Sequence, residues 1–261
     1  MIGVFDSGIG GLTVFKELKE KLPHTSLVYF ADTLHLPYGE KEVGEIKTFT
    51  KNITTFLLKQ NINALVIACN TASAIGRDSA KEVAPALGIY DVIQPTVKKA
   101  IGITKNRKVG IIGTKAAMSS NAYSIFLERE SFGAITPIQR PTPLLVPMIE
   151  KGILSGEFDE KLIRESVIAP EFEGIDTLIL GCTHYPLIKE PVQKILTEEG
   201  KNIEIINSSE AVCEDVVTTF KEKDTEESPQ YLFFASKVTP ELEEFTSRFL
   251  GEEITYTQVA L

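Results

Sequence analysis

The chain has 261 residues, of which 43% are apolar and 24% are charged, and its formal net charge is −9. This composition is typical of a globular protein with sizeable cores, and the acidic balance, without a basic cluster on any predicted helix or loop, argues against nucleic acid as a partner. No apolar run approaches the roughly 20 residues that cross a bilayer, and no charged and then apolar leader follows Met1, so we expect a cytoplasmic protein without a membrane partner.

The first part of the chain predicts alternating strands and helices. The strands are short apolar runs, and the helices carry apolar residues at helical spacing. The expected elements are the strand Ile2–Phe5, a helix from Leu12 to Leu22, the strand Ser26–Ala31, the helix Val43–Gln60, the strand Ala64–Ala68, a helix from Asn70 to near Pro85, and the strand Ile89–Ile93. Gln94-Pro95 indicates a hinge into a second unit, which starts with a helix after Pro95.

The second part continues the same alternation, interrupted by a proline-rich stretch from 137 to 147 for which no element is predicted. The expected elements are the strand Lys108–Ile112, a helix from Ser119 to Arg129, the strand Thr177–Leu180, a helix from Pro186 to Glu199, the strand Ile203–Ile206, the helix Ser209–Lys221, the strand Tyr231–Ala235, the helix Pro240–Phe249 and a strand near Ile254–Thr257. Such alternation is typical of α/β domains.

Two pairs of similar segments indicate an internal duplication. Ile2–Gly8 resembles Val109–Lys115, and Leu65–Thr71 resembles Leu178–His184 at nearly the same offset. The two cysteine runs lack alternation, which is typical of central parallel strands. We therefore expect an α/β fold of two pseudo-symmetric doubly wound domains with mainly parallel sheets and an active site in the cleft between them. The alternative is the repetition that any doubly wound protein shows.

Cys69 and Cys182 are the strongest candidates for chemistry, because each follows a buried strand and precedes a predicted helix. An unperturbed thiol is only a few per cent ionised at neutral pH. Helix N-termini and free backbone amides favour the thiolate, so both settings predict thiols that transfer protons. Either cysteine alone is equally compatible with a small buried apolar residue. Cys213 lies on an apolar helical face, which indicates packing.

The glycine-rich segment Asp6–Gly11 predicts a nest of backbone amides for a carboxylate or phosphate. Thr13 stands where the dinucleotide motif has its last glycine, and the Walker lysine is missing, so the segment does not indicate a nucleotide cofactor. A tight capped turn explains the glycines equally well. It explains Asp6 less well, because a carboxylate in such a turn is costly without a cation.

Three further positions are weaker candidates. Pro37-Tyr38-Gly39 predicts either a pocket wall or a plain turn. His184 could donate a proton or hold the Cys182 thiolate, and it could equally be structural. Glu150 ends an apolar segment directed at the interior, although solvent exposure is the default for an acidic residue. Three cysteines without a C-x-x-C spacing argue against a disulfide framework and a structural zinc site, so we expect reduced thiols and no metal.

Taken together, these positions resemble the glutamate racemases, the cofactor-independent enzymes that supply D-glutamate for peptidoglycan. The matching segments follow one another in the family's order from one end of the chain to the other. They are Phe5–Gly11, Pro37–Gly39, Ala68–Ser73, Gly113-Thr114, Val146–Glu150 and Gly181–Pro186. The resemblance implies an isomerase that binds a small-molecule substrate, L- or D-glutamate, and uses no cofactor.

The resemblance also implies roles for individual residues. Cys69 is expected to act on D-glutamate and Cys182 on L-glutamate, with Asp6 and His184 as their supporting groups and Glu150 also near the site. The substrate-binding residues that it implies are Asp6, Ser7, Pro37, Tyr38, Gly39, Asn70, Thr71, Thr114, Thr183 and His184.

By the same resemblance, residues 1–93 and 207–261 form one domain, residues 94–206 form the other, and we expect a homodimer. One departure from the family pattern is Leu34-His35-Leu36, where many members have Arg-Val before the proline. The detailed shape of the pocket wall at Pro37-Tyr38-Gly39 is therefore not predicted. No amino-terminal extension is present of the kind that some members use for activation by a cell-wall precursor, so such control is not expected.

Racemisation at an α-carbon requires one group on each face, and two opposed cysteines meet that need, one as thiolate and one as thiol. The closest alternative is racemisation of aspartate or another acidic substrate, against which His184 argues by family pattern. A non-catalytic anion-binding module with buried cysteines is another alternative. A thiol hydrolase is a third, but no Cys-His-Asn order with an oxyanion loop is present.

Overall fold

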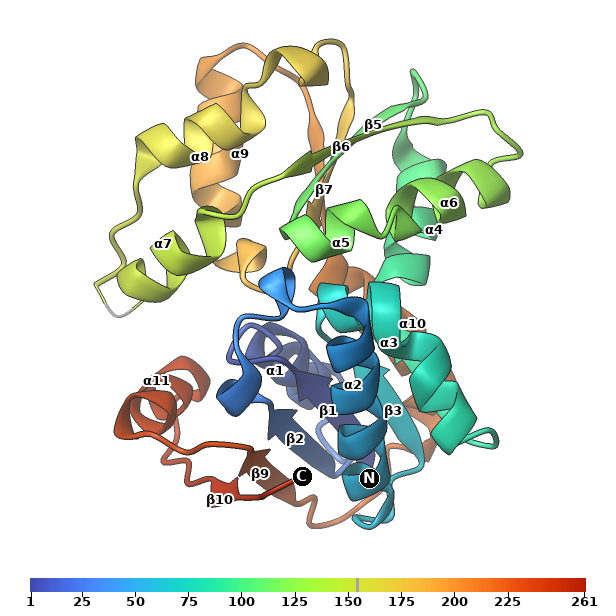
Figure 1. The fold of residues 1–261 in the computed structure, drawn as a ribbon, viewed down its shortest axis with the longest axis vertical. Helices are drawn as coiled ribbons and strands as arrows, with labels where there is room; N and C mark the ends of the chain where they lie inside the picture. The colour runs from blue at the N-terminus through green and yellow to red at the C-terminus, as the bar shows by residue number, and fades with distance from the viewer. Residues whose placement is uncertain (154) are drawn as a thin grey trace.

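The computed structural model describes residues 1–153 and 155–261, and within them two parallel β-sheets (Figure 1). The first sheet has the order β10-β9-β2-β1-β3-β4 and the second the order β6-β5-β7-β8. The first sheet contains β1 (Ile2–Asp6), β2 (Leu27–Ala31), β3 (Ala64–Ile67), β4 (Gly88–Asp91), β9 (Tyr231–Ala235) and β10 (Thr257–Gln258). The second contains β5 (Lys108–Gly113), β6 (Thr136–Pro141), β7 (Thr177–Gly181) and β8 (Glu204–Asn207).

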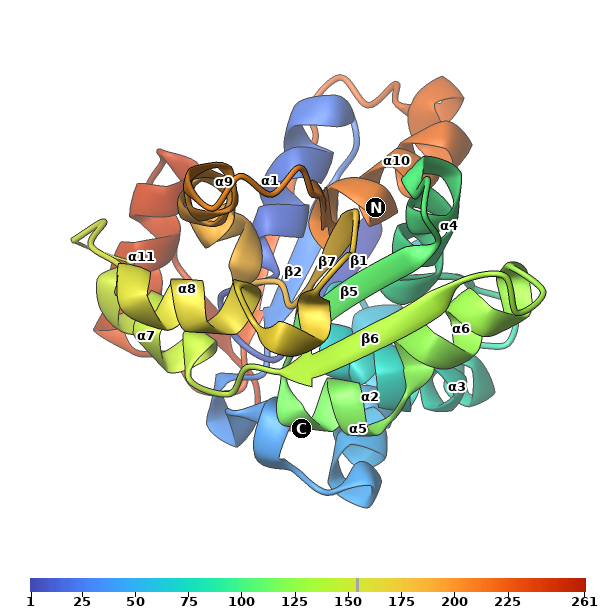
Figure 2. The ribbon, with the colours of Figure 1, turned by 90° about the horizontal axis from the view of Figure 1, so that it is seen from above.

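Helices cover both sheets, and Figure 2 shows the second sheet overlying the first when the molecule is seen from above. The helices are α1 (Leu12–Lys21), α2 (Val43–Leu58), α3 (Asn70–Val83), α4 (Ile93–Ile103), α5 (Lys115–Ser119), α6 (Ala122–Glu130), α7 (Leu145–Gly152), α8 (Glu160–Val167), α9 (Lys189–Glu198), α10 (Ser208–Phe220) and α11 (Pro240–Leu250). Short 3₁₀ helices span Thr33–His35, Tyr38–Glu40, Pro170–Phe172, Tyr185–Ile188 and Lys221–Lys223. None of the helices in the described part of the chain combines the length and apolar character that a bilayer-spanning segment requires.

The expected α/β class with two doubly wound, mainly parallel sheets is confirmed. β1, β2 and β7 are buried along their whole length, which explains why their sequences are apolar without alternation. The order β2-β1-β3-β4 in the first sheet matches β6-β5-β7-β8 in the second. In this correspondence β1 matches β5 and β3 matches β7, the same pairs whose sequences are similar.

One buried apolar cluster runs from the first sheet into the second. It includes Val66 of β3, Ile179 of β7, Val97 of α4 and Val212 of α10. The predicted division at residues 93/94 and 206/207 stays a prediction.

Four predictions between Ile89 and Pro147 differ from the structure. β4 ends at Asp91, and Gln94 and Pro95 lie in the first turn of α4 instead of in a hinge before it. The expected helix Ser119–Arg129 is two helices, α5 and α6, because Asn121 between them adopts a left-handed conformation with φ of 55°. The proline-rich stretch contains β6 and the start of α7.

Candidate active site

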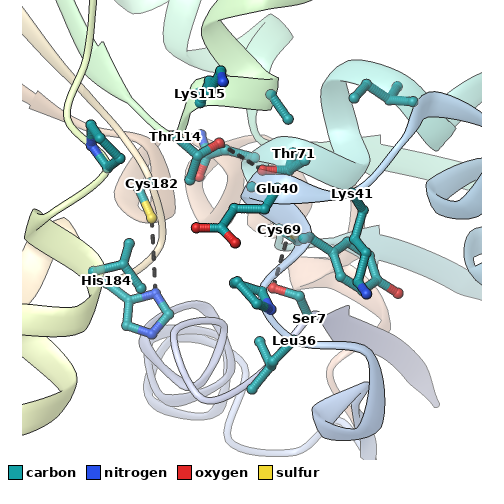
Figure 3. Close-up of a pocket in the computed structure, with 18 of the residues that line it drawn as sticks. Ser7, Leu36, Glu40, Lys41, Cys69, Thr71, Thr114, Lys115, Cys182 and His184 are labelled. Atoms are coloured by element: carbon teal, nitrogen blue, oxygen red, sulfur yellow. Dashed lines mark hydrogen bonds between the residues drawn. The ribbon is translucent and has the colours of Figure 1, made fainter.

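Residues that follow the strands of both sheets surround one cavity of about 750 Å³ (Figure 3). Its position outside the carboxyl ends of parallel strands is the usual place for a ligand in such folds. The predicted residues on its wall are Ser7, Pro37, Tyr38, Gly39, Cys69, Asn70, Thr71, Thr114, Glu150, Cys182, Thr183 and His184. Asp6 lies behind this wall and is fully buried.

Cys69 connects β3 to α3, and its sulfur takes part in capping the helix. Its Sγ accepts a hydrogen bond from the Ala72 N–H at 3.4 Å and donates to Ser7 Oγ at 3.5 Å. The side chain is 5% exposed, so only a small part of it reaches the cavity. The expectation that Cys69 precedes a helix is therefore confirmed, with α3 beginning at the next residue.

Burial and the nearby Asp6 carboxylate raise the pKa of the Cys69 thiol to about 12, although the Ala72 N–H and the Ser7 hydroxyl oppose this shift. We expected backbone amides to lower the pKa of this thiol, and that expectation is wrong because its pKa is raised overall. The amide contact is present, but desolvation and the neighbouring negative charge outweigh it. Cys69 is thus a protonated thiol at neutral pH.

Asp6 connects the two walls of the cavity through its buried carboxylate. Its carboxylate accepts hydrogen bonds from the Gly8 N–H at 2.9 Å and from the Thr183 hydroxyl at 3.2 Å. The glycine turn therefore uses one of its amides for the chain's own carboxylate. A Cβ at Gly10 would lie 2.4 Å from Thr183 Oγ1 and 2.6 Å from His184 Nδ1, so glycine is needed there for the close approach of the two walls.

Cys182 lies across the cavity, after β7, in a line of three groups. Its Sγ is 3.8 Å from His184 Nδ1, and His184 Nε2 is 3.1 Å from Glu150 Oε1. Figure 3 shows the Cys182 sulfur above the His184 ring on the wall opposite Cys69 and Ser7. Glu150 comes from α7 and is exposed, as the default for an acidic residue predicts, and its carboxylate lies at the cavity wall.

His184 is 4% exposed, and burial alone lowers its pKa. The hydrogen bonds with Cys182 and Glu150 outweigh that effect and raise the pKa of His184 to about 10. The ring is therefore an imidazolium at neutral pH, set between a carboxylate and a sulfur. The two cysteines consequently lie in opposite surroundings, one beside an anion and the other beside a cation.

Polar side chains from both sheets meet on the remaining wall. Thr71 Oγ1 lies 2.9 Å from Thr114 Oγ1, and Asn70 Nδ2 donates to the Tyr123 hydroxyl at 2.7 Å. Asn70 is 2% exposed, and its Oδ1 has no hydrogen-bond partner among the described residues. An acceptor of this kind on a cavity wall is suited to an ammonium or another donor.

The loop that departs from the family pattern forms a side of the cavity. Leu36 and Tyr38 line it, and the Tyr38 hydroxyl donates to the Asp32 carboxylate. His35 contacts the same carboxylate at 2.8 Å and stacks on Phe49 with ring centroids 4.0 Å apart. The loop is therefore held by a buried carboxylate, and the Tyr38 hydroxyl points to Asp32.

Sequence reasoning missed several charged residues of the wall. Glu40, Lys41 and Lys115 all line the cavity. Glu40 and Lys41 directly follow Pro37-Tyr38-Gly39, and Lys115 directly follows Thr114, so adjacency to predicted site residues was the available signal. The described residues contain no group of three or more side chains suited to hold a metal ion.

Two sulfurs on facing walls, one near a carboxylate and one near an imidazolium, can give and take a proton on opposite sides of a small molecule. Hydroxyl and amide groups around them can hold a carboxylate as negative charge develops next to it. The arrangement therefore suits proton transfer at a carbon next to a carboxylate.

Comparisons with known proteins agree with this chemistry. Residues 10–216 match the family model described as Asp/Glu/Hydantoin racemase. Glutamate racemase 3 of Caldanaerobacter subterraneus subsp. tengcongensis is 38% identical over 263 residues, which cover 100% of this chain and 94% of that protein.

Solved structures of glutamate racemases have the same fold. One from Bacillus anthracis has a TM-score of 0.91 at 33% identity and covers 100% of this chain and 97% of its own. Another, from Francisella tularensis in complex with D-glutamate, has a TM-score of 0.87 at 35% identity and covers 99% of this chain and 96% of its own. The chain therefore belongs to the Asp/Glu/hydantoin racemase family of isomerases.

Proposed function

We propose that the chain is a cofactor-independent glutamate racemase that interconverts L- and D-glutamate by proton transfer at the α-carbon. The observation that carries this proposal is the position of Cys69 and Cys182 after corresponding strands, on facing walls of one cavity. Support for glutamate as the substrate comes from the similar proteins, which carry that name or were solved with D-glutamate.

In the direction from L to D, Cys182 takes the α-proton as a thiolate and Cys69 returns one as a thiol to the other face. The reverse direction exchanges these roles. The imidazolium of His184, held by Glu150, stabilises negative charge at Cys182. The high pKa of Cys69 favours its protonated form, which is the form that this direction requires.

Donors around the cavity hold the substrate's carboxylates. Thr71 and Thr114 offer hydroxyl groups on its wall, together with the Ser7 hydroxyl and the Asn70 amide. Thr183 also lies on the wall, where its hydroxyl donates to Asp6. The α-hydrogen is weakly acidic, so donors placed where negative charge grows lower the barrier.

The proposal extends to the setting of the reaction. The D-glutamate formed would supply peptidoglycan synthesis in the cytoplasm, and the protein would act as a homodimer of chains divided into residues 1–93 with 207–261 and residues 94–206. Closure of the two domains on the substrate would exclude water. Crystal structures with and without D-glutamate test closure, and identical domain angles would contradict it.

The decisive experiment follows solvent deuterium into the α-position of each glutamate enantiomer. Wild type should exchange and racemise both. Cys69→Ser and Cys182→Ser should each lower racemisation by about 100-fold or more, because each removes one of the two proton-transfer groups. Cys213→Ala is the matched control, because Cys213 is buried in α10 and contacts Val14 O.

Full racemisation by either serine variant would contradict the two-cysteine mechanism. Exchange with aspartate but not with glutamate would contradict the substrate assignment. No exchange, with Cys69 and Cys182 both inert to thiol reagents in the folded protein, would favour a non-catalytic anion-binding module.

A further inference from the structure

Glu40 brings a negative charge into the cavity that the proposed reaction does not use. It ends the short 3₁₀ helix Tyr38–Glu40 and lines the cavity. Figure 3 shows its carboxylate directed into the cavity, between the wall of Cys182 and His184 and the wall of Ser7 and Cys69. No hydrogen bond among the residues drawn there reaches this carboxylate.

The backbone that carries Glu40 is fixed against the opposite wall. A Cβ at Gly39 would lie 3.0 Å from Thr114 Cβ, so the loop packs closely on the start of α5. The Glu40 N–H donates to Pro37 O at 3.3 Å, and the Tyr38 hydroxyl is anchored on Asp32. The position of the Glu40 backbone is therefore set, while its exposed side chain is free to rotate.

Two lysines on the cavity wall are alternative partners for the Glu40 carboxylate. Lys41 and Lys115 line the same cavity and come from the two sides of the contact between Gly39 and Thr114. A substrate with two carboxylates and one ammonium carries a net negative charge, and a like charge in a partly enclosed cavity repels it. Rotation of Glu40 toward either lysine would relieve that repulsion.

We propose that Glu40 is a carboxylate gate that sets the affinity for anionic substrates: its side chain competes with a substrate carboxylate for the cavity and swings toward Lys41 or Lys115 when substrate binds. This inference rests on the proposed function only in taking the substrate to be a dicarboxylic amino acid. Both enantiomers of such a substrate carry the same charges. The gate therefore weakens the binding of both alike.

The test compares wild type with Glu40→Gln, which keeps the size of the side chain and removes its charge. The KM for L- and for D-glutamate should fall by about threefold to tenfold, while kcat changes by less than twofold, because the gate acts on binding and not on proton transfer. Glu128→Gln on the exposed face of α6 makes the same charge change away from the cavity and should leave both constants unchanged.

Ionic strength separates a charge effect from a change in loop shape. The ratio of the wild-type KM to the Glu40→Gln KM should approach one as salt rises from about 20 mM to about 500 mM, because salt screens the repulsion. An unchanged or raised KM in Glu40→Gln, or a ratio that is independent of salt, would overturn the gate.

These outcomes are distinct from failure of the proposed function. If wild type racemises glutamate and the KM of the variant is unchanged, only the gate is wrong. If wild type shows no exchange with either enantiomer, the proposed reaction is wrong, and calorimetric titration of both proteins with D-glutamate still decides the gate. Tighter binding by Glu40→Gln would support it, and equal or undetectable binding would overturn it.

Discussion

Two cysteines of similar sequence context occupy opposite electrostatic surroundings. Cys69 lies near the buried Asp6 carboxylate, which together with desolvation raises its pKa to about 12. Cys182 lies 3.8 Å from the ring of His184, whose pKa is raised to about 10. The protein therefore favours a proton on Cys69 and a positive charge beside Cys182. Under the proposed function, this distribution suits removal of the α-proton of L-glutamate by Cys182.

His184→Asn should lower the kcat for L-glutamate by about 100-fold, because the variant loses the cation beside Cys182. Stability adds a readout that depends on pH. The pKa of His184 is raised on folding, so its contribution to the free energy of unfolding is complete below about pH 6.5 and is lost as pH rises through about 10. Urea denaturation of wild type should therefore show a larger loss of stability between pH 7 and 10 than that of the variant.

The matched control is His24→Asn, since His24 is exposed and lies outside the cavity. It should leave both the kcat and the pH dependence of stability at wild-type values. Equal losses of stability in wild type and His184→Asn across this pH range would contradict the charged state of His184.

At the scale of elements, the helices α2 and α3 pack so closely that one position admits only glycine. A Cβ at Gly76 of α3 would lie 2.2 Å from Thr50 Oγ1 and 2.9 Å from Thr50 Cβ. Thr50 lies on α2 and is fully buried, with its hydroxyl donating to Ile46 O. Neither partner can move aside without disturbing a helix.

Gly76→Ala should therefore destabilise the protein by about 1–3 kcal/mol, because the cost of overpacking exceeds the gain in helix propensity. Gly44→Ala in α2 is the control, since a Cβ there would meet nothing within 4 Å. It should stabilise the protein by up to about 1 kcal/mol. Urea denaturation of both variants measures these effects. A Gly76→Ala variant as stable as Gly44→Ala would show that the two helices separate easily.

Elements with a strong periodic pattern could be predicted from the sequence, and those that depend on tertiary position could not. β9 was predicted to the residue, from an apolar run between polar segments. β6 contains Pro137 and Pro141, which normally argue against a strand. Among the described residues it is an edge strand paired with β5 alone, so a missing N–H can face away from the sheet.

A local polar contact explains the error at the junction of β4 and α4. The Asp91 carboxylate accepts hydrogen bonds from the N–H groups of Ile93 and Gln94, which ends β4 and begins α4 at once. Pro95 then falls in the first helical turn, where its missing N–H has no intrahelical partner to lose. In the sequence, an aspartate that begins a helix in this way cannot be distinguished from any other loop aspartate, so this helix start was not predicted.

The candidate site was predictable where residue type and strand position coincide. Both cysteines and most of the polar residues implied for the site line the cavity. Glu40 and Lys115 were missed, because their only sequence signal is adjacency to Pro37-Tyr38-Gly39 and to Thr114, and a charged residue next to a site residue is more often solvated. Their place on the wall results from the packing of Gly39 against Thr114, a contact between segments far apart in the chain.

At the scale of the whole molecule, hydrogen bonds beside the cavity join residues that follow strands of the first sheet to residues of the second part of the fold. Asn70 follows β3 of the first sheet, and its Nδ2 donates to the hydroxyl of Tyr123 on α6, which packs on the second. Thr71 and Thr114 make a second link, and Asp6 and Thr183 a third. Because these links also orient groups on the cavity wall, we expect stability and substrate affinity to change together.

Tyr123→Phe tests that coupling. Without the hydroxyl, Asn70 Nδ2 keeps only a contact of 3.5 Å with Ser208 Oγ, so a buried donor is left poorly paired. The free energy of unfolding should fall by about 1–3 kcal/mol. The KM for glutamate should rise by about threefold to tenfold, because the Asn70 amide loses its orientation toward the cavity. Tyr90→Phe on β4, outside the cavity, should change neither quantity. A loss of stability with an unchanged KM would show that the link between the sheets does not set the geometry of the site.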